Sequence, residues 1–344
     1  MANSNEPLSE DLDHWRKLAL SMEEQIGKVV VGQSRAIRLI TVAVFSRGHV
    51  LLEGDVGVGK TTLLRAVSRA VGGEIERIEG TVDLLPSDLV YHTYISEEGK
   101  PVVNPGPILK HGERLSIFFF NEINRARPQV HSMMLRVMAE RSVTAFNTDY
   151  YMPHLQVFAD RNRMERDETY EIPAAARDRF MMEFSIGLPK DPELQLALMT
   201  DVRFHDADTL IESVAENILD FKKLNAISGL IQNQVHVSRK VQEYALSLCS
   251  ASREPELYSI SVSDVDVSRL IQSGASPRGM SMLLKAARVR AWLEGREIVL
   301  PEDIRDLFAD CMKHRIFFTP VYEMRRTEIA DAFVDSMIST ISSP

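Results

Sequence analysis

The stretch HVLLEGDVGVGKTTLL, residues 49–64, decides the fold class of this chain. Its first five residues form an apolar run typical of a buried strand, and helical periodicity extends from Lys60 to about Ala70. Between them, residues 54–61 match the pattern G-x-x-x-x-G-K-[ST] at every fixed position. A strand, a glycine-rich loop and a helix in this order predict a phosphate-binding loop at the edge of an α/β sheet.

Each part of this loop has a chemical reason. The glycines allow the backbone to wrap around a phosphate chain, and the N-terminus of the following helix adds a positive dipole. We expect the Lys60 ammonium to reach the β- and γ-phosphates of ATP and the Thr61 hydroxyl to bind Mg²⁺. The predicted nucleotide-binding residues of the loop are Gly54, Asp55, Val56, Gly57, Val58, Gly59, Lys60, Thr61 and Thr62.

Other apolar runs indicate the remaining strands of this sheet. They are apolar on both faces, as buried parallel strands are, and they lie at residues 115–120, 155–159 and 182–186. Helical segments at 128–140 and 173–180 separate them. This alternation predicts a doubly wound parallel sheet that binds its ligand at the carboxyl ends of the strands.

Additional segments surround this predicted core. An amphipathic pattern at residues 8–26 predicts a helix that docks on the main body, and a second helix is expected at about 34–46. Two β-hairpins are predicted as insertions, at residues 90–103 with a turn at 98–100 and at residues 143–151 with a turn at 147–149.

The second half of the chain has a different pattern. Strand signals fade after residue 188 and helical periodicity replaces them. Ser276 followed by Pro277 predicts a helix start, and so does Pro301. A last helix is expected at about 321–342. We therefore predict an α/β nucleotide-binding domain at residues 1–188 and an all-α domain at residues 189–344.

A second candidate site follows the predicted strand at 115–120, which ends in Asn121-Glu122. P-loop ATPases usually end such a strand with an aspartate that orders Mg²⁺ and a glutamate that polarises the attacking water. Glu122 stands at the position of this general base. Asn121 stands at the metal position, where an amide can accept a hydrogen bond from a metal-bound water but supplies no negative charge.

These residues carry a resemblance to a known family. The stretch NEINRA at residues 121–126 resembles the DEINRA signature of the MoxR branch of the AAA+ ATPases, with one residue altered. Further matches in the family's order are residues 49–64, LLPSD at 84–88, PGPI at 105–108, DRF at 178–180, GASPR at 274–278 and LEGREIVLPED at 293–303.

The resemblance implies an AAA+ core followed by a helical lid, with nucleotide at their junction and subunits assembled in a ring, most often a hexamer. It further implies a chaperone-like activity on a client protein, often with a partner that contains a von Willebrand factor A domain. The branch takes its name from methanol dehydrogenase maturation, which makes that enzyme a candidate client. The implied role is maturation or metal-cofactor loading of the client.

The resemblance also gives roles to three residues. Asn162 matches the sensor 1 asparagine, which helps to position the attacking water. Arg179 resembles the arginine finger that reaches a neighbouring subunit's nucleotide, and Arg278 resembles sensor 2, which reaches the γ-phosphate from the lid. Cations suit these roles because a transferring phosphoryl group carries spread negative charge. One departure is that residues 159–163 read ADRNR, where the family stretch reads like ATQNP.

The composition disfavours several classes of function. A net charge of −9 disfavours binding to a nucleic-acid backbone, which needs cationic surface, so no nucleic-acid partner is expected. No apolar run approaches the length of a membrane span, and the N-terminus is polar and acidic. The two cysteines, Cys249 and Cys311, lack ligand spacing and are expected to be buried free thiols, as in a reducing compartment. The expected location is the cytoplasm.

Two other readings stay open at this point. Asn121 and the altered loop at 159–163 are compatible with a slow or non-hydrolysing nucleotide-dependent switch or scaffold. A nucleic-acid motor is the second alternative, and it would need a basic channel in an acidic protein.

Overall fold

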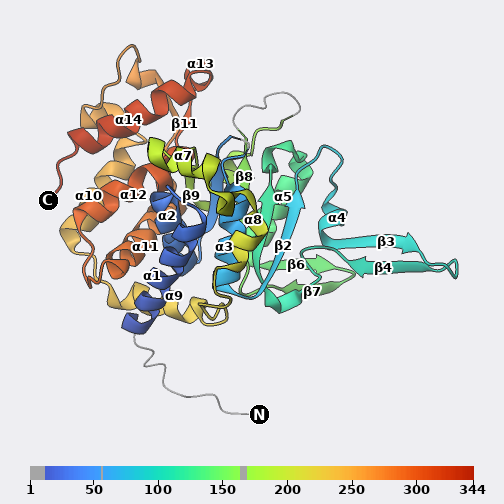
Figure 1. Cartoon of the computed structure of the whole chain (residues 1–344). Coiled ribbons are helices and arrows are strands. Elements are labelled where there is room, and N and C mark those ends of the chain that lie inside the picture. Colours follow the sequence, from blue (N-terminus) through green and yellow to red (C-terminus); the bar gives the residue numbers. More distant parts are fainter. Residues whose placement is uncertain (1–11, 56, 163–168) are drawn as a thin grey trace.

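The computed structural model describes residues 12–55, 57–162 and 169–344, and its first part is built on a five-stranded parallel sheet (Figure 1). The strand order is β2-β5-β8-β1-β9, so β8 lies between β5 and β1. The strands are β2 (Glu74–Glu79), β5 (Leu115–Asn121), β8 (Gln156–Arg161), β1 (His49–Glu53) and β9 (Phe180–Ser185). The predicted α/β class and parallel sheet are confirmed.

Sequence patterns located four of these strands and missed one. Every residue of β1 and of β5 is buried, which is why apolar runs marked them. The missed strand, β2, has the sequence EIERIE and lies at an edge of the sheet, next to β5. An edge strand tolerates charged residues because one side of it meets solvent. Its pattern therefore does not resemble that of a buried strand.

Helices cover both faces of the sheet. On one face α1 (Leu12–Val29), α2 (Ser34–Ser46) and α3 (Lys60–Val71) pack with strand residues such as Phe119 and Phe158. On the other face α5 (Pro128–Glu140) packs in a second apolar cluster. The predicted helix at 8–26 is observed from Leu12, and its predicted first residues lie outside the described ranges. The helix expected at 173–180 is a single turn, α6 (Ala174–Arg177), because Phe180 already begins β9.

Both predicted hairpins are present, and Figure 1 shows them projecting from the core on the side away from the second half of the chain. The first consists of β3 (Tyr91–Ile95) and β4 (Pro101–Pro105), preceded by α4 (Pro86–Val90). The second consists of β6 (Ser142–Ala145) and β7 (Thr148–Tyr151). Its turn is shorter than predicted: Phe146 and Asn147 both have positive φ, as a two-residue type I′ turn requires, and Thr148 is already in the strand.

The second half of the chain is mainly helical. Its helices are α7 (Pro192–Thr200), α8 (Ala207–Glu212), α9 (Leu224–Gln234), α10 (Arg239–Ala251), α11 (Pro277–Leu293), α12 (Pro301–Met312), α13 (Pro320–Glu323) and α14 (Arg326–Thr340). A short antiparallel pair, β10 (Ile271–Ser273) and β11 (Phe317–Phe318), joins them. The Ser276 hydroxyl accepts the Gly279 amide as the predicted helix cap. Cys249 and Cys311 are buried free thiols, as expected.

The two halves contact each other closely. Arg315, almost fully buried, donates to the carbonyl of Phe180 at 2.6 Å and so caps the open edge of β9. After the predicted boundary at 188, the chain returns to the first half, since the Asn217 and Leu219 amides donate to carbonyls at the end of α3. The division at residue 188 stays a prediction. None of the helices in the described ranges is long and apolar enough to cross a membrane.

One buried histidine makes the stability of this sheet depend on pH. His49 Nδ1 accepts the Val157 amide at 2.9 Å, and Nε2 lies 3.0 Å from the Met138 carbonyl, which requires the neutral ring. Burial lowers the pKa of His49 to about 3, below its ordinary value of 6.5. Protonation therefore favours the unfolded chain. The contribution of His49 to stability is complete above pH 6.5 and is lost as the pH falls toward 3.

We expect His49→Gln to weaken this acid sensitivity. Over the fall from pH 6.5 to pH 5 the wild type should lose about 2 kcal/mol of unfolding free energy through this residue. Denaturant unfolding at several pH values measures the slope of unfolding free energy against pH. His92→Gln, at an exposed position, is the matched control. A His49→Gln variant with the wild-type slope would contradict the assignment.

Candidate nucleotide-binding site

The predicted phosphate loop connects the end of β1 to the start of α3. Gly57 and Gly59 have φ of +80° and +88°, and a Cβ added at either would meet nothing within 4 Å. Their backbone is therefore left-handed and faces open space, as a cradle for phosphates requires. At Gly54 a side chain is excluded by close packing, since a Cβ there would lie 2.3 Å from the Ile186 carbonyl oxygen. Val56 lies outside the described residues.

Lys60 is held inside the loop by two oxygen partners. Its ammonium donates to the Gly54 carbonyl at 2.7 Å and pairs with the Asp160 carboxylate at 3.0 Å. The Lys60 side chain is 10% exposed and that of Asp160 1%. Burial raises the pKa of Asp160, while the Glu122 amide and the charge of Lys60 act to lower it.

Asp160 joins the candidate site through these contacts, although motif comparison did not propose it. It belongs to β8, where the register places it beside Leu52 of β1, while the residue before it, Ala159, pairs with Phe120 of β5. Its Oδ1 accepts the Glu122 amide at 2.6 Å. The signal available in the sequence was an aspartate directly after the apolar run at 155–159, in a parallel sheet whose carboxyl edge binds the ligand.

Asn121 and Glu122 lie at the same edge of the sheet, at the end of β5. The Asn121 amide donates to the Glu79 carboxylate at 2.5 Å. Glu122 has a φ of +51°, and its carboxylate pairs with Arg125 at 3.0 Å. A positive φ in a residue other than glycine is a strained conformation that clusters at functional sites. Gly80 leaves room for the Glu122 backbone, since a Cβ at residue 80 would lie 2.1 Å from the Glu122 carbonyl oxygen.

These residues fit ATP and Mg²⁺. The loop offers an open glycine cradle and a largely buried ammonium, and the N-terminus of the twelve-residue helix α3 follows them. The oxygen donors at this edge are the Thr61 hydroxyl, the Asn121 amide and the Asp160 and Glu122 carboxylates. Hard oxygen ligands of this kind are those that Mg²⁺ prefers. Thr62, next in α3, is partly buried, and Asp55 and Gly57 are exposed; Val58 packs beside Gly54.

Asn162, the predicted sensor, follows β8 and is buried. It lies on the wall of a cavity of about 710 Å³ to which the second half of the chain contributes Arg326 and neighbouring residues. Arg161, one of the charged residues of the altered loop, pairs with Glu183 at 2.8 Å and with Glu53 at 3.3 Å. Its charge is thus balanced by carboxylates of β1 and β9, which follow β8 on one side of the sheet. Arg163 lies outside the described ranges.

The structure does not bring Arg179 and Arg278 to the loop of their own chain. Arg278 pairs with Asp178 at 2.7 Å, and Arg179 donates to the Ala175 carbonyl at 2.8 Å. Arg179 directly precedes β9, and the ion pair with Asp178 places Arg278 of α11 at the same end of that strand. The first residue of β9 pairs with the first residue of β1. The phosphate loop follows the last residue of β1, about 16 Å further along the sheet at 3.3 Å per residue.

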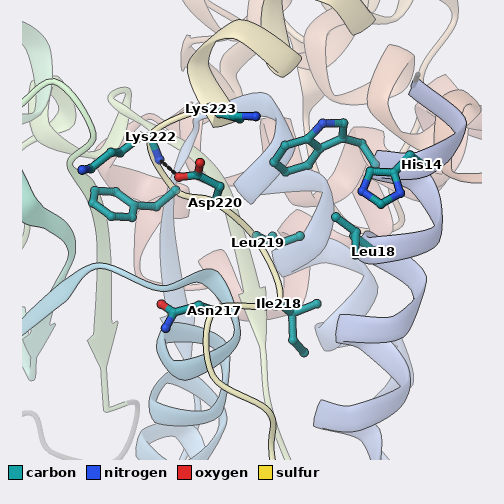
Figure 2. A pocket seen from close by; sticks show the side chains of 10 residues that line it. His14, Leu18, Asn217, Ile218, Leu219, Asp220, Lys222 and Lys223 are labelled. Carbon is teal, nitrogen blue, oxygen red and sulfur yellow. Dashed lines mark hydrogen bonds between the residues drawn. The ribbon is translucent and has the colours of Figure 1, made fainter. Parts of the chain in front are cut away.

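Another cavity, of about 650 Å³, lies between α1 and the loop at residues 217–223. Figure 2 shows His14 and Leu18 of α1 facing Ile218 and Leu219 of that loop. The loop is tied to the C-terminal end of α3, while Lys60 begins that helix. This cavity is therefore separate from the nucleotide-binding site.

Comparisons with known proteins agree with this fold. Residues 49–182 match the family model described as ATPase family associated with various cellular activities (AAA), and residues 264–335 match that of the AAA lid domain. Protein MoxR of Methylorubrum extorquens is 54% identical, covering 99% of this chain and 100% of the relative.

More distant relatives also match over most of their length. Protein MoxR of Paracoccus denitrificans is 51% identical over 98% of this chain and 99% of its own. Chaperone MoxR1 of Mycobacterium tuberculosis is 30% identical over 93% of this chain and 81% of its own. A solved structure from Cytophaga hutchinsonii has a TM-score of 0.81 and 28% identity, covering 97% of both chains.

Proposed function

Because this chain belongs to the MoxR family of AAA+ ATPases, we propose that it couples the binding and hydrolysis of Mg-ATP to the remodelling of a partner protein. The observation that carries the proposal is the meeting of Lys60 and Glu122 at one sheet edge. Asp160 links them, since it pairs with Lys60 and accepts the Glu122 amide. A phosphate-binding cation and a candidate general base are thus held in one hydrogen-bonded unit.

The chemistry divides between binding and activation. The backbone amides of the glycine loop and the Lys60 ammonium hold the phosphates, and the Thr61 hydroxyl with Asn121 would hold Mg²⁺. The metal, when bound, neutralises charge that develops on the phosphate oxygens. Glu122 accepts the proton of the attacking water, and Arg125, which now pairs with its carboxylate, keeps that side chain at the sheet edge. Asn162 orients the same water.

We propose that the working unit is a ring, a hexamer by analogy with the family. Arg179 and Arg278 support this arrangement, because both lie at the end of the sheet opposite to their own phosphate loop. In a ring with head-to-tail contacts they would meet the nucleotide of the next subunit. Arg278 then acts on the neighbour's γ-phosphate together with the Arg179 finger, rather than from the lid onto its own.

The partner is proposed to be a client protein in the cytoplasm that needs maturation or metal-cofactor loading, with methanol dehydrogenase as the candidate and a von Willebrand factor A domain protein as an assistant. The two hairpins offer it an apolar contact surface. Ile95 is 75% exposed, and the Phe146 and Tyr91 rings contact each other at a tilt of 49°, with centroids 4.8 Å apart. An apolar cavity of about 340 Å³ lies between the hairpins. Apolar surface of this kind marks protein-binding sites.

The test is a Glu122→Gln variant, which keeps the size of the side chain and removes the base. We expect ATP turnover to fall by about 10²- to 10⁴-fold while ATP affinity is retained. A variant that binds but does not hydrolyse should retain its client, so the tagged variant should capture it from extracts of the native host in the presence of Mg-ATP.

The comparison between variants decides between a motor and a switch. If the wild type hydrolyses ATP no faster than Glu122→Gln, with and without client, the hydrolysis proposal is wrong and the slow or non-hydrolysing switch is favoured. Asn121, which lacks the expected charge, is the specific observation behind that second candidate.

A further inference from the structure

The acidic group of this site stands one strand away from its expected place. At the end of β5, where the family signature has an aspartate, Asn121 carries an amide that is engaged with Glu79. At the end of the adjacent strand β8, Asp160 carries a carboxylate that is 1% exposed and paired with Lys60 at 3.0 Å. Strand β8 thus places a buried carboxylate in direct contact with the Lys60 ammonium of the phosphate loop.

Two departures from the family pattern coincide here, and they have opposite signs. At residue 121 an acid is replaced by a neutral amide, and at residue 160 an aspartate stands where the stretch ATQNP has a neutral threonine. These two changes cancel each other in formal charge. Arg161, a further charged replacement in the same stretch, pairs with Glu183 and Glu53. Either of the two changes alone would alter the formal charge by one unit, next to a largely buried lysine, where an unbalanced charge is costly.

The sheet register shows why a carboxylate at residue 160 of β8 can serve the same site as one at residue 121 of β5. Asp160 lies beside Leu52, one residue before the end of β1, from which the phosphate loop departs. Neighbouring strands are about 4.8 Å apart, so a shift from β5 to β8 brings the carboxylate nearer to the loop. The contact with the Glu122 amide keeps it attached to the candidate base.

We propose that Asp160 is the metal-positioning residue of this site and takes the role that the signature assigns to residue 121. The inference rests on the proposed function, since it concerns the Mg²⁺ that accompanies ATP. Asp160 supplies the negative charge that attracts the hydrated cation, and its contact with Lys60 holds that ammonium at the phosphate position. Asn121 contributes through its amide and links the site to Glu79.

The test measures how strongly Mg²⁺ improves nucleotide binding, without any turnover. A fluorescent ADP analogue is titrated into the full-length protein at a series of Mg²⁺ concentrations. Asp160→Asn is nearly isosteric and should raise the Mg²⁺ concentration at half effect by about 10- to 100-fold, the range found when groups that support a metal site are removed. The Mg²⁺-free affinity should not fall, because the amide oxygen of the replacement can still accept a hydrogen bond from Lys60 and hold it in place.

The decisive control returns the carboxylate from residue 160 to residue 121. The double variant Asn121→Asp with Asp160→Asn restores the acid of the signature and should recover the Mg²⁺ dependence to within about threefold of the wild type. The proposal is overturned if Asp160→Asn keeps the wild-type Mg²⁺ dependence, or if it weakens binding equally with and without Mg²⁺.

Folding failure is also decisive. If Asp160→Asn does not fold, the double variant alone provides the result. A double variant that folds and shows wild-type Mg²⁺ dependence supports the proposal, and one that also fails to fold shows that Asp160 serves the fold and overturns it. A wild type that binds no nucleotide, or binds it without regard to Mg²⁺, contradicts the proposed function itself.

Discussion

Replacing Arg179 with alanine is expected to slow ATP turnover by about 10³-fold or more, the range found for arginine fingers. The reason is geometric as well as chemical. Among the residues that the structure describes, the Arg179 guanidinium has one hydrogen-bond partner, the Ala175 carbonyl, so the side chain retains donors for a phosphate. It also lies too far from its own loop to act there. Nucleotide affinity should change little, since binding relies on the loop.

A mixing experiment separates action between subunits from a folding defect. Arg179→Ala subunits keep an intact loop, and Lys60→Ala subunits keep an intact finger. In an equal mixture about a quarter of the ring interfaces combine the two intact parts, so measurable turnover should return although each variant alone is inactive. If the mixture stays inactive, action between subunits is wrong. Arg239→Ala, at an exposed arginine of α10, is the matched control.

Replacing Lys60 with alanine is expected to have two effects. The loss of a largely buried ammonium that holds phosphates should cost roughly 2–5 kcal/mol of nucleotide binding, at least about 30-fold in affinity. The variant should also be less stable without any nucleotide, because Asp160 then remains buried without its cationic partner. Breaking a buried pair in this way costs about 3–5 kcal/mol.

Denaturant unfolding and nucleotide titration measure the two effects separately. Adding Asp160→Asn to Lys60→Ala should recover most of the lost stability, because the uncompensated charge is removed, but none of the lost affinity. Recovery of both would contradict the phosphate role of Lys60. Lys100→Ala in the turn of the first hairpin is the matched control, since its ion pair with Glu98 is exposed.

Local motifs supplied most residues of the candidate site. The glycine pattern of residues 54–61 predicted the loop, and its backbone has the left-handed glycines that the pattern implies. Asn121 and Glu122 were located because a long buried strand precedes them. Asp160 was read only as a departure from the stretch ATQNP, since nothing in its local sequence shows that Lys60 lies 3.0 Å away.

The same distinction applies to the arginines. A motif can indicate that Arg179 and Arg278 act on a phosphate. It does not show whether that phosphate is bound by their own subunit or by a neighbouring one. That depends on the parallel pairing of β9 with β1, which places both residues opposite to the loop, and on the contact of Arg278 with Asp178.

The sequence by itself determined the fold class and the family, and it predicted the phosphate loop and the candidate base, because these depend on residues close together in the chain. Hydrophobic periodicity and glycine spacing are local properties, and they are readable without a fold. Only the tertiary structure decided which charges meet. The order β5-β8-β1 brings Asp160 between Glu122 and Lys60, residues 38 positions before it and 100 positions before it in the chain. Such a meeting follows from strand order, which no local pattern encodes.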